Sequence, residues 1–332
     1  MFSRFRYVTP VPVKAATGRV AEVYAQQAAG FGLRRMPVFM TLSPAPDVQA
    51  AIWALVRESL LAGRAPRVGK EVVAAEVSRA NRCPYCVAAH TALLHATGAH
   101  RLAEAVLRGE PPADPGHAAL VAWAGATRGR RAPAAPFPPE HAAEYLGTAL
   151  AFHFINRIAS ALLTEDVLPG GAQRLRAARV FAGWAVARAT RRPVRPGEGL
   201  RVLAGLPAAE EPRWAAGTPI GVAYATLRAA AGAGGELLGD AARAAVRDAV
   251  AAWDGGHPPL GDAWLGDALA GVPAADRPAA RLALLAACAP YRVGDADVRA
   301  WREGHPSDAD LVRLVAFGAI TAVERFETAI QP

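Results

Sequence analysis

Two cysteines, one histidine and one glutamate are spaced so that they can carry redox chemistry. Cys83 and Cys86 are separated by two residues, and His90 follows the second cysteine by four positions. Two thiols at this spacing can close a disulfide across one helical turn, so the pair can alternate between dithiol and disulfide. A neutral imidazole one turn beyond Cys86 can accept the proton of its thiol. Glu71, twelve positions before Cys83, can orient the histidine if its own helix packs on the cysteine helix.

Helical sequence surrounds these residues. Pro84 suits the first position of a helix, where its missing N–H costs nothing, and the apolar run 87–94 continues that helix. Cys83 then takes the N-cap, where free backbone N–H groups and the helix dipole favour a thiolate. The neighbouring imidazole favours Cys86 instead, so the residues alone leave the choice of nucleophile open. A preceding helix is predicted over 68–80.

The pattern E-x11-C-x-x-C-x3-H resembles the alkylhydroperoxidase D-like fold of the carboxymuconolactone decarboxylase superfamily. The resemblance implies an all-α helical bundle and a cofactor-free thiol oxidoreductase of peroxiredoxin type, which reduces alkyl hydroperoxides. It implies that Cys86 attacks the peroxide, while Cys83 resolves the intermediate and meets a thiol or dithiol reductant. Glu71 and His90 would form the proton relay. Hydroperoxidases proper carry a second histidine where this chain has Tyr85, which is a poor base near neutral pH.

Other interpretations of the motif stay open. A zinc site with Glu71 as fourth ligand is one, although structural zinc usually takes two ligand pairs and the chain has no second pair. A structural disulfide and an inert buried cluster are two more. The superfamily's lactone decarboxylases lack the cysteine pair, so decarboxylation is not implied. Rival functions are a dithiol–disulfide reductase acting on protein or lipoyl disulfides and a non-catalytic helical scaffold.

The composition of the 332-residue chain narrows its function further. The formal net charge is +8, but the arginines are spread along the chain without a recognised DNA-binding motif, so no nucleic-acid partner is expected. No apolar run approaches the roughly 18 residues of a membrane span, and the first residues lack the apolar stretch of a signal peptide. With three cysteines, these features predict a cytoplasmic protein without a membrane partner.

A weak internal repeat relates the two ends of the chain. Residues 119–122 resemble 283–286, and 151–152 resemble 316–317, with an offset of 164 or 165 positions in both places. The same offset equates the cysteine helix with 241–253, which has no cysteine and no histidine. We therefore predict a tandem duplication whose second copy has lost its chemistry.

Three domains follow from this repeat. The first, 1–170, holds the redox pair; a helical connector rich in arginine and proline spans 171–215; and a degenerate copy occupies 216–332. Relatives of the family form trimers or larger rings, so the resemblance also implies a homo-oligomer.

Histidines outside the motif are weaker candidates. Further helices are predicted over 18–30, 48–62, 100–108, 117–128, 140–163 and 171–189. The helix 140–163 carries an F-x-N-R stretch that resembles the family, and its His153 is a possible pocket residue together with Tyr85. His95 and His100 are predicted to lie at the surface, because a lone histidine needs partners to form a site.

Overall fold

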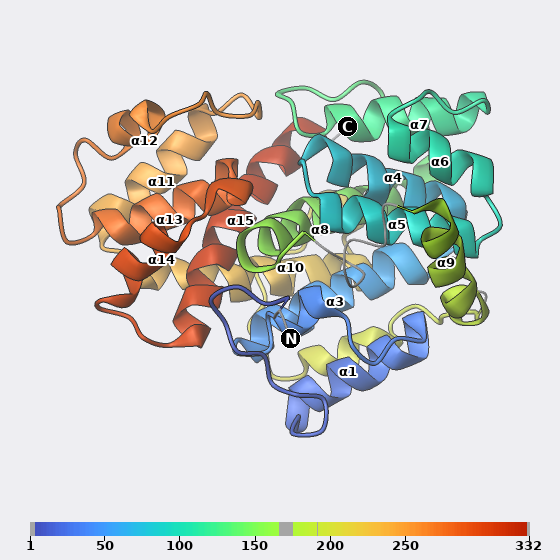
Figure 1. The fold of residues 1–332 in the computed structure, drawn as a ribbon, viewed down its shortest axis with the longest axis horizontal. Helices are drawn as coiled ribbons and strands as arrows, with labels where there is room; N and C mark the ends of the chain where they lie inside the picture. The colour runs from blue at the N-terminus through green and yellow to red at the C-terminus, as the bar shows by residue number, and fades with distance from the viewer. Residues whose placement is uncertain (1–3, 166–174, 191, 331–332) are drawn as a thin grey trace.

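A computed structural model describes residues 4–165, 175–190 and 192–330 (Figure 1). Within these ranges the secondary structure is helical and no β-sheet occurs, although an isolated antiparallel bridge joins Phe5 to Leu163. The predicted all-α fold is confirmed. None of the described helices combines the length and the apolar character needed to cross a membrane.

The helices divide into an N-terminal set, a connecting helix and a C-terminal set. The first set is α1 (Gly18–Phe31), α2 (Pro37–Met40), α3 (Pro46–Val56), α4 (Arg67–Ala80), α5 (Pro84–Ala96), α6 (His100–Arg108), α7 (Pro115–Ala126) and α8 (Ala142–Leu162). The connecting helix is α9 (Arg176–Thr190). The last set is α10 (Pro219–Gly232), α11 (Asp240–Ala252), α12 (Ala263–Ala268), α13 (Arg277–Cys288), α14 (Asp295–Arg302) and α15 (Asp308–Ile330).

Proline fixes the start of many of these helices. Its locked φ suits the first turn, and its missing N–H is one that the turn leaves unpaired in any case. The prolines that open a helix are Pro37, Pro46, Pro84, Pro115 and Pro219. The proline-rich sequence therefore divides an alanine-rich chain into short helices instead of a few long ones.

The helix predicted over 48–62 is interrupted. It consists of α3 followed by a π-helical turn, Arg57–Leu61. Glu58 in this turn is buried and accepts hydrogen bonds from the backbone N–H groups of Gly197 and Gly199, at 2.7 and 3.0 Å. The turn thereby attaches the segment after α9 to the first half of the molecule.

One hydrophobic core runs through both halves of the chain. Helix α8 lies at the centre and packs along α15, and α3 packs along α10, so each pair joins one helix from either half (Figure 1). Helices α8 and α15 are also the ones that carry the second repeated sequence, at 151–152 and 316–317. The domain boundaries predicted at 170 and 215 follow from the sequence repeat. They do not separate two hydrophobic cores, because one core includes residues from both halves.

The connecting helix α9 covers the cysteine helix α5. Gly183 permits this close approach, because a Cβ there would lie 2.6 Å from the carbonyl oxygen of Ala92. On α9, Phe181 and Trp184 stack with ring centroids 5.8 Å apart, and both side chains are exposed. The cysteine helix is thus enclosed between α4 and α9.

The helix predicted over 241–253 is present as α11, but its neighbours differ from those of the cysteine helix. Helix α11 packs against α13 and α15, whereas α5 packs against α4 and α9. Helix α11 and the cysteine helix therefore have different packing environments. That they descend from equivalent parts of a duplicated sequence stays a prediction.

Candidate active site

Helices α4 and α5 bring both cysteines into the interior. Between the helices, Arg82 adopts a left-handed φ of 53°, which non-glycine residues adopt rarely, and the chain reverses there so that α5 packs back on α4. Cys83 occupies the N-cap of α5 and Pro84 the first helical position, as predicted. Both cysteines of the pair are free thiols, with Cys83 1% and Cys86 2% exposed.

The two thiols have opposite pKa shifts. Burial raises the pKa of Cys83, but hydrogen bonding with Cys86 outweighs burial and brings the pKa below its ordinary value. Burial raises the pKa of Cys86 well above its ordinary value, and its bond to Cys83 raises it further. Cys83 is therefore the thiol of the pair that ionises more readily, and the helix terminus also favours its thiolate.

Glu71 and His90 form a buried pair that joins α4 to α5. His90 Nδ1 donates a hydrogen bond to Glu71 Oε2 at 2.6 Å. Because a carboxylate can only accept, Nδ1 carries the proton and Nε2 is the nitrogen that can take one up. Arg67 forms an ion pair with Glu71 Oε1 at 2.6 Å. Burial raises the pKa of Glu71, but Arg67 and His90 outweigh burial and hold the pKa below its ordinary value.

The ionised Glu71 is expected to make the free energy of unfolding depend on pH. Its folded pKa lies below the unfolded value of about 4.5, so its contribution is fully present above about pH 4.5 and is lost as the pH falls through the folded pKa. The difference in unfolding free energy between wild type and Glu71→Gln should stay constant from about pH 6 to about pH 4.5 and shrink as the pH falls further toward about pH 3. Urea unfolding across this range measures it, and a difference that stays constant to the lowest pH would contradict an ionised Glu71.

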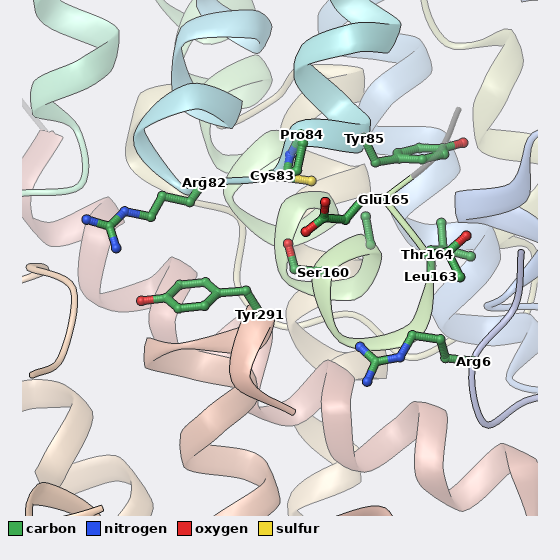
Figure 2. A pocket seen from close by; sticks show the side chains of 11 residues that line it. Arg6, Arg82, Cys83, Pro84, Tyr85, Ser160, Leu163, Thr164, Glu165 and Tyr291 are labelled. Atoms are coloured by element: carbon green, nitrogen blue, oxygen red, sulfur yellow. The ribbon is translucent and has the colours of Figure 1, made fainter. Parts of the chain in front are cut away.

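The two thiols open onto different cavities. An inner chamber of about 60 Å³ is lined by Phe31, Met36, Val38, Phe39, Val56, Tyr85, Cys86, Ala89, His90, Leu93, Phe152 and Ile155. An outer pocket of about 280 Å³, drawn in Figure 2, is lined by Arg6, Arg82, Cys83, Pro84, Tyr85, Ala159, Ser160, Leu163, Thr164, Glu165 and Tyr291. Cys86 and His90 thus share the inner chamber, and Cys83 lies at the outer pocket.

The imidazole and the thiol both line the inner chamber. Among the residues that the structure describes, no hydrogen bond joins His90 directly to Cys86. The chamber is several times the roughly 10–15 Å³ that one water molecule requires. A proton can therefore pass from Cys86 to His90 through a molecule bound in the chamber.

Tyr85 lines both cavities, in keeping with its prediction as a possible pocket residue. Burial, followed by the charge of the cysteine pair, raises the pKa of its phenol above the ordinary value. The phenol therefore keeps its proton at neutral pH and acts as a hydrogen-bond donor. It does not replace the base that hydroperoxidases proper carry at this position.

His153, a possible pocket residue from the sequence, lines neither cavity. Its Nδ1 accepts a hydrogen bond from Asn81 Nδ2 at 3.0 Å, and its Nε2 donates to Thr127 Oγ1 at 2.9 Å. Burial and nearby guanidinium groups lower its pKa well below the ordinary value. One position along a helix turns a side chain by about 100°. Phe152 therefore faces the chamber instead, with its ring 4.3 Å from that of His90.

His95 is buried, which corrects the prediction that it lies at the surface. Its Nε2 donates to Glu104 Oε1 at 3.0 Å, and its Nδ1 accepts from His100 at 2.9 Å. Arg179 from α9 donates to the same carboxylate at 2.8 Å. The prediction failed because α9 covers this part of α5, which its distance in sequence concealed. His100 is exposed as predicted.

A buried amide beside Cys86 was not among the residues predicted from the sequence. Asn156 on α8 donates to Ser78 Oγ at 2.9 Å and accepts from Asn81 Nδ2 at 2.9 Å, which fixes the orientation of its amide. A hydrogen bond from Asn156 to the thiol of Cys86 acts against burial and lowers the pKa of that thiol. Its place in the F-x-N-R stretch was the signal that pointed to it. Arg67 was signalled only by its position one turn before Glu71.

The zinc interpretation has no matching geometry in the part of the chain that is described. No group of three or more histidine, cysteine, aspartate or glutamate side chains is arranged there to hold a metal ion. Glu71 instead engages Arg67 and His90, and the two thiols of the pair engage each other.

Known proteins are similar to the motif-bearing region of this chain and, in one case, to nearly its whole length. A family model described as the Carboxymuconolactone decarboxylase family matches residues 46–128, which contain all four motif residues. A Mycobacterium tuberculosis protein named Alkyl hydroperoxide reductase Rv2159c is 42% identical over 325 residues, covering 97% of this chain and 94% of that protein. The chain belongs to the carboxymuconolactone decarboxylase family. No solved structure gives a significant match.

This carboxymuconolactone decarboxylase family member is an alkylhydroperoxidase D-like helical bundle in tandem duplicate. The relative matches both halves of the chain, and that length fits the duplication. The family model matches only within the N-terminal half. The C-terminal copy is degenerate, because Cys288 is its single cysteine and no cysteine pair remains there.

Proposed function

We propose that the chain is a thiol-dependent peroxidase that reduces hydroperoxides, alkyl hydroperoxides included, through a Cys83–Cys86 dithiol–disulfide cycle. One observation carries this proposal: Cys86 shares the inner chamber with His90, whose Nδ1 is bonded to Glu71, while Cys83 lies at a separate pocket. The name of the Mycobacterium tuberculosis relative, an alkyl hydroperoxide reductase, supports a peroxide as substrate.

The first step of the proposed cycle takes place in the inner chamber. The pKa of Cys86 is raised, so its proton must be removed before its sulfur can attack. His90 Nε2 takes that proton, and the ionised Glu71 stabilises the resulting imidazolium. The sulfur of Cys86 attacks one peroxide oxygen, the O–O bond breaks, and the alkoxide leaves with the proton as an alcohol. Cys86 is left as a sulfenic acid.

The second step closes the disulfide. Cys83 has the lower pKa of the pair and is therefore the thiolate that attacks the sulfur of Cys86. The sulfenic oxygen leaves as water. Over both steps, two thiols and one hydroperoxide become one disulfide, one alcohol and one water molecule, so atoms and electrons balance.

The size of the inner chamber limits the substrate. Its lining is almost entirely apolar, with Cys86 and His90 the reactive exceptions, and its volume is about 60 Å³. An apolar lining favours an alkyl group beside the peroxide, and the small volume favours a short or slender one. Small alkyl hydroperoxides are therefore the proposed substrate class.

Peroxide is expected to oxidise the pair and to spare the third cysteine. One equivalent should lower the number of titratable thiols in the denatured protein from three to one. The peptide spanning Cys83 and Cys86 should lose two hydrogens by mass spectrometry. Cys288 is buried, and burial raises its pKa to about 12, so it should stay reduced.

The variant Cys83→Ser separates the two steps of this oxidation. It should accumulate a sulfenic acid on Cys86, detectable as a dimedone adduct, because no thiolate remains to close the disulfide. A disulfide between two chains through Cys288, or peroxide consumption without loss of two thiols, is the outcome that rejects the cycle.

A dithiol–disulfide reductase is the second candidate function. Tyr85, which stands where hydroperoxidases proper carry a histidine, favours this second function, because the inner chamber then has one base fewer to assist peroxide reduction. Steady-state turnover with a small alkyl hydroperoxide, compared with turnover of lipoyl and protein disulfides, distinguishes the two. A folded protein that turns over none of them is a scaffold.

Cytoplasmic location and homo-oligomerisation stay predictions. Light scattering tests the predicted homo-oligomer.

A further inference from the structure

The inner chamber meets solvent beside a methionine. Of the described residues that line it, all but Met36 and Ala89 are buried. Residues 32–35, which lead to Met36, are exposed as well. A hydroperoxide that enters the chamber from solvent therefore passes the side chain of Met36 before it reaches Cys86.

Met36 brings a second sulfur to this chamber. Its side chain is unbranched, apolar and flexible, and it packs against the edge of the hydrophobic core. Its carbonyl oxygen accepts hydrogen bonds from the backbone N–H groups of Phe39 and Met40, both at 3.0 Å, which fix the backbone at the start of α2. A thioether reacts with peroxides to give a sulfoxide. Met36 is therefore a second oxidisable group on the path to Cys86.

Met40 supplies a comparison four residues further along. It is 9% exposed and packs with Val20 and Tyr24 in a small cluster apart from the main core. It does not line the inner chamber. The two methionines thus differ in their access to the chamber, although they lie in the same segment of the chain.

We propose that Met36 is a modification site, at which a hydroperoxide entering the inner chamber oxidises the thioether to a sulfoxide and so closes the chamber to further substrate. This rests on the proposed function and adds a way in which excess substrate stops it. The sulfur attacks one peroxide oxygen, the O–O bond breaks, and the hydroxyl proton passes to the departing alkoxide. One methionine and one hydroperoxide become one methionine sulfoxide and one alcohol.

The size and lining of the chamber explain why the sulfoxide closes it. The chamber holds about 60 Å³ and is lined almost entirely by apolar side chains. Oxidation adds an oxygen atom to Met36 and turns an apolar side chain into a polar one. The added oxygen occupies space that a small alkyl group needs, and its dipole disfavours an alkyl group beside it.

The first test measures where the oxygen is added. In the double variant Cys83→Ser/Cys86→Ser no thiol of the pair consumes peroxide, so the methionines react alone. The protein is treated with ethyl hydroperoxide, and fragment ions of the peptide that holds both residues report sulfoxide at Met36 and at Met40. Met36 should be oxidised about ten-fold faster than Met40.

The second test measures the consequence for turnover. Wild type is treated with excess ethyl hydroperoxide, its disulfide is reduced with dithiothreitol, and the remaining peroxidase rate is compared with its own starting rate. The rate should fall about five-fold and return after treatment with methionine sulfoxide reductases A and B, which do not act on cysteine sulfinic acid. Met36→Leu, a substitution of similar volume, should keep most of its own starting rate. Met40→Leu is the matched control and should lose activity as wild type does.

Two results would overturn this proposal: equal oxidation of Met36 and Met40, or equal loss of rate in wild type and Met36→Leu. The first test contains no redox cysteine of the pair, so its outcome is independent of the proposed cycle. If ethyl hydroperoxide leaves the Cys83 and Cys86 thiols of wild type reduced, the proposed function is rejected instead.

Discussion

His90→Ala is expected to slow the reaction of Cys86 with hydroperoxide by about 10²- to 10⁴-fold, the range over which general base catalysis contributes. The pKa of the Cys86 thiol is raised by burial, so little thiolate forms unless a base removes the proton. His90 is the base that lines the same chamber, and its Nδ1 donates a hydrogen bond to Glu71 Oε2 at 2.6 Å. Glu71→Gln should cause a smaller loss, because an amide holds the ring without stabilising the imidazolium.

Alkylation rates separate this effect from unfolding. The rate of iodoacetamide modification at each cysteine, read by mass spectrometry, should fall at Cys86 and stay close to wild type at Cys83, which has its own hydrogen bonds. His117→Gln changes a histidine on α7, outside both cavities, and should alter neither rate. If Cys86 reacts at the wild-type rate in His90→Ala and Glu71→Gln, the proton relay does not operate and the scaffold interpretation gains support.

Lys70→Met is expected to lower the free energy of unfolding by about 3–5 kcal/mol, the cost of leaving a buried charge without its partner. Lys70 Nζ donates to Glu144 Oε2 and to the Ala62 carbonyl oxygen, each at 2.6 Å. Both charged side chains are buried, so neither ion regains full hydration after its partner is removed. Urea unfolding monitored by circular dichroism measures the loss.

The chain supplies its own control for this substitution. Lys14 is the other lysine in the sequence and is exposed, so Lys14→Met should change the unfolding free energy by less than about 0.5 kcal/mol. Adding Glu144→Gln to Lys70→Met should restore part of the stability, because the unpaired carboxylate is then removed. A Lys70→Met protein as stable as the Lys14→Met protein would show that this ion pair does not stabilise the fold.

Much of the fold was accessible from the sequence because its signals are local. Pro84 and the apolar run after it define the start of α5, and the cysteine spacing places Cys83 at the N-cap. The interrupted helix at Arg57–Leu61 was not accessible, because the bonds of Glu58 reach Gly197 and Gly199, far along the chain. His95 was misplaced for the same reason, since α9 covers it.

The sequence by itself determined which residues can carry redox chemistry: the thiol pair, His90 and Glu71 have the required types and spacing. It left open which thiol is the nucleophile, because the helix terminus favours Cys83 as the thiolate and the imidazole one turn away favours Cys86. Only the packing of α4, α5 and α8 decided that Cys86 shares a chamber with His90 and Phe152. A cavity is bounded by side chains from distant segments, and no local pattern encodes their common boundary. The contribution of Tyr291 to the pocket over Cys83 arises in the same way.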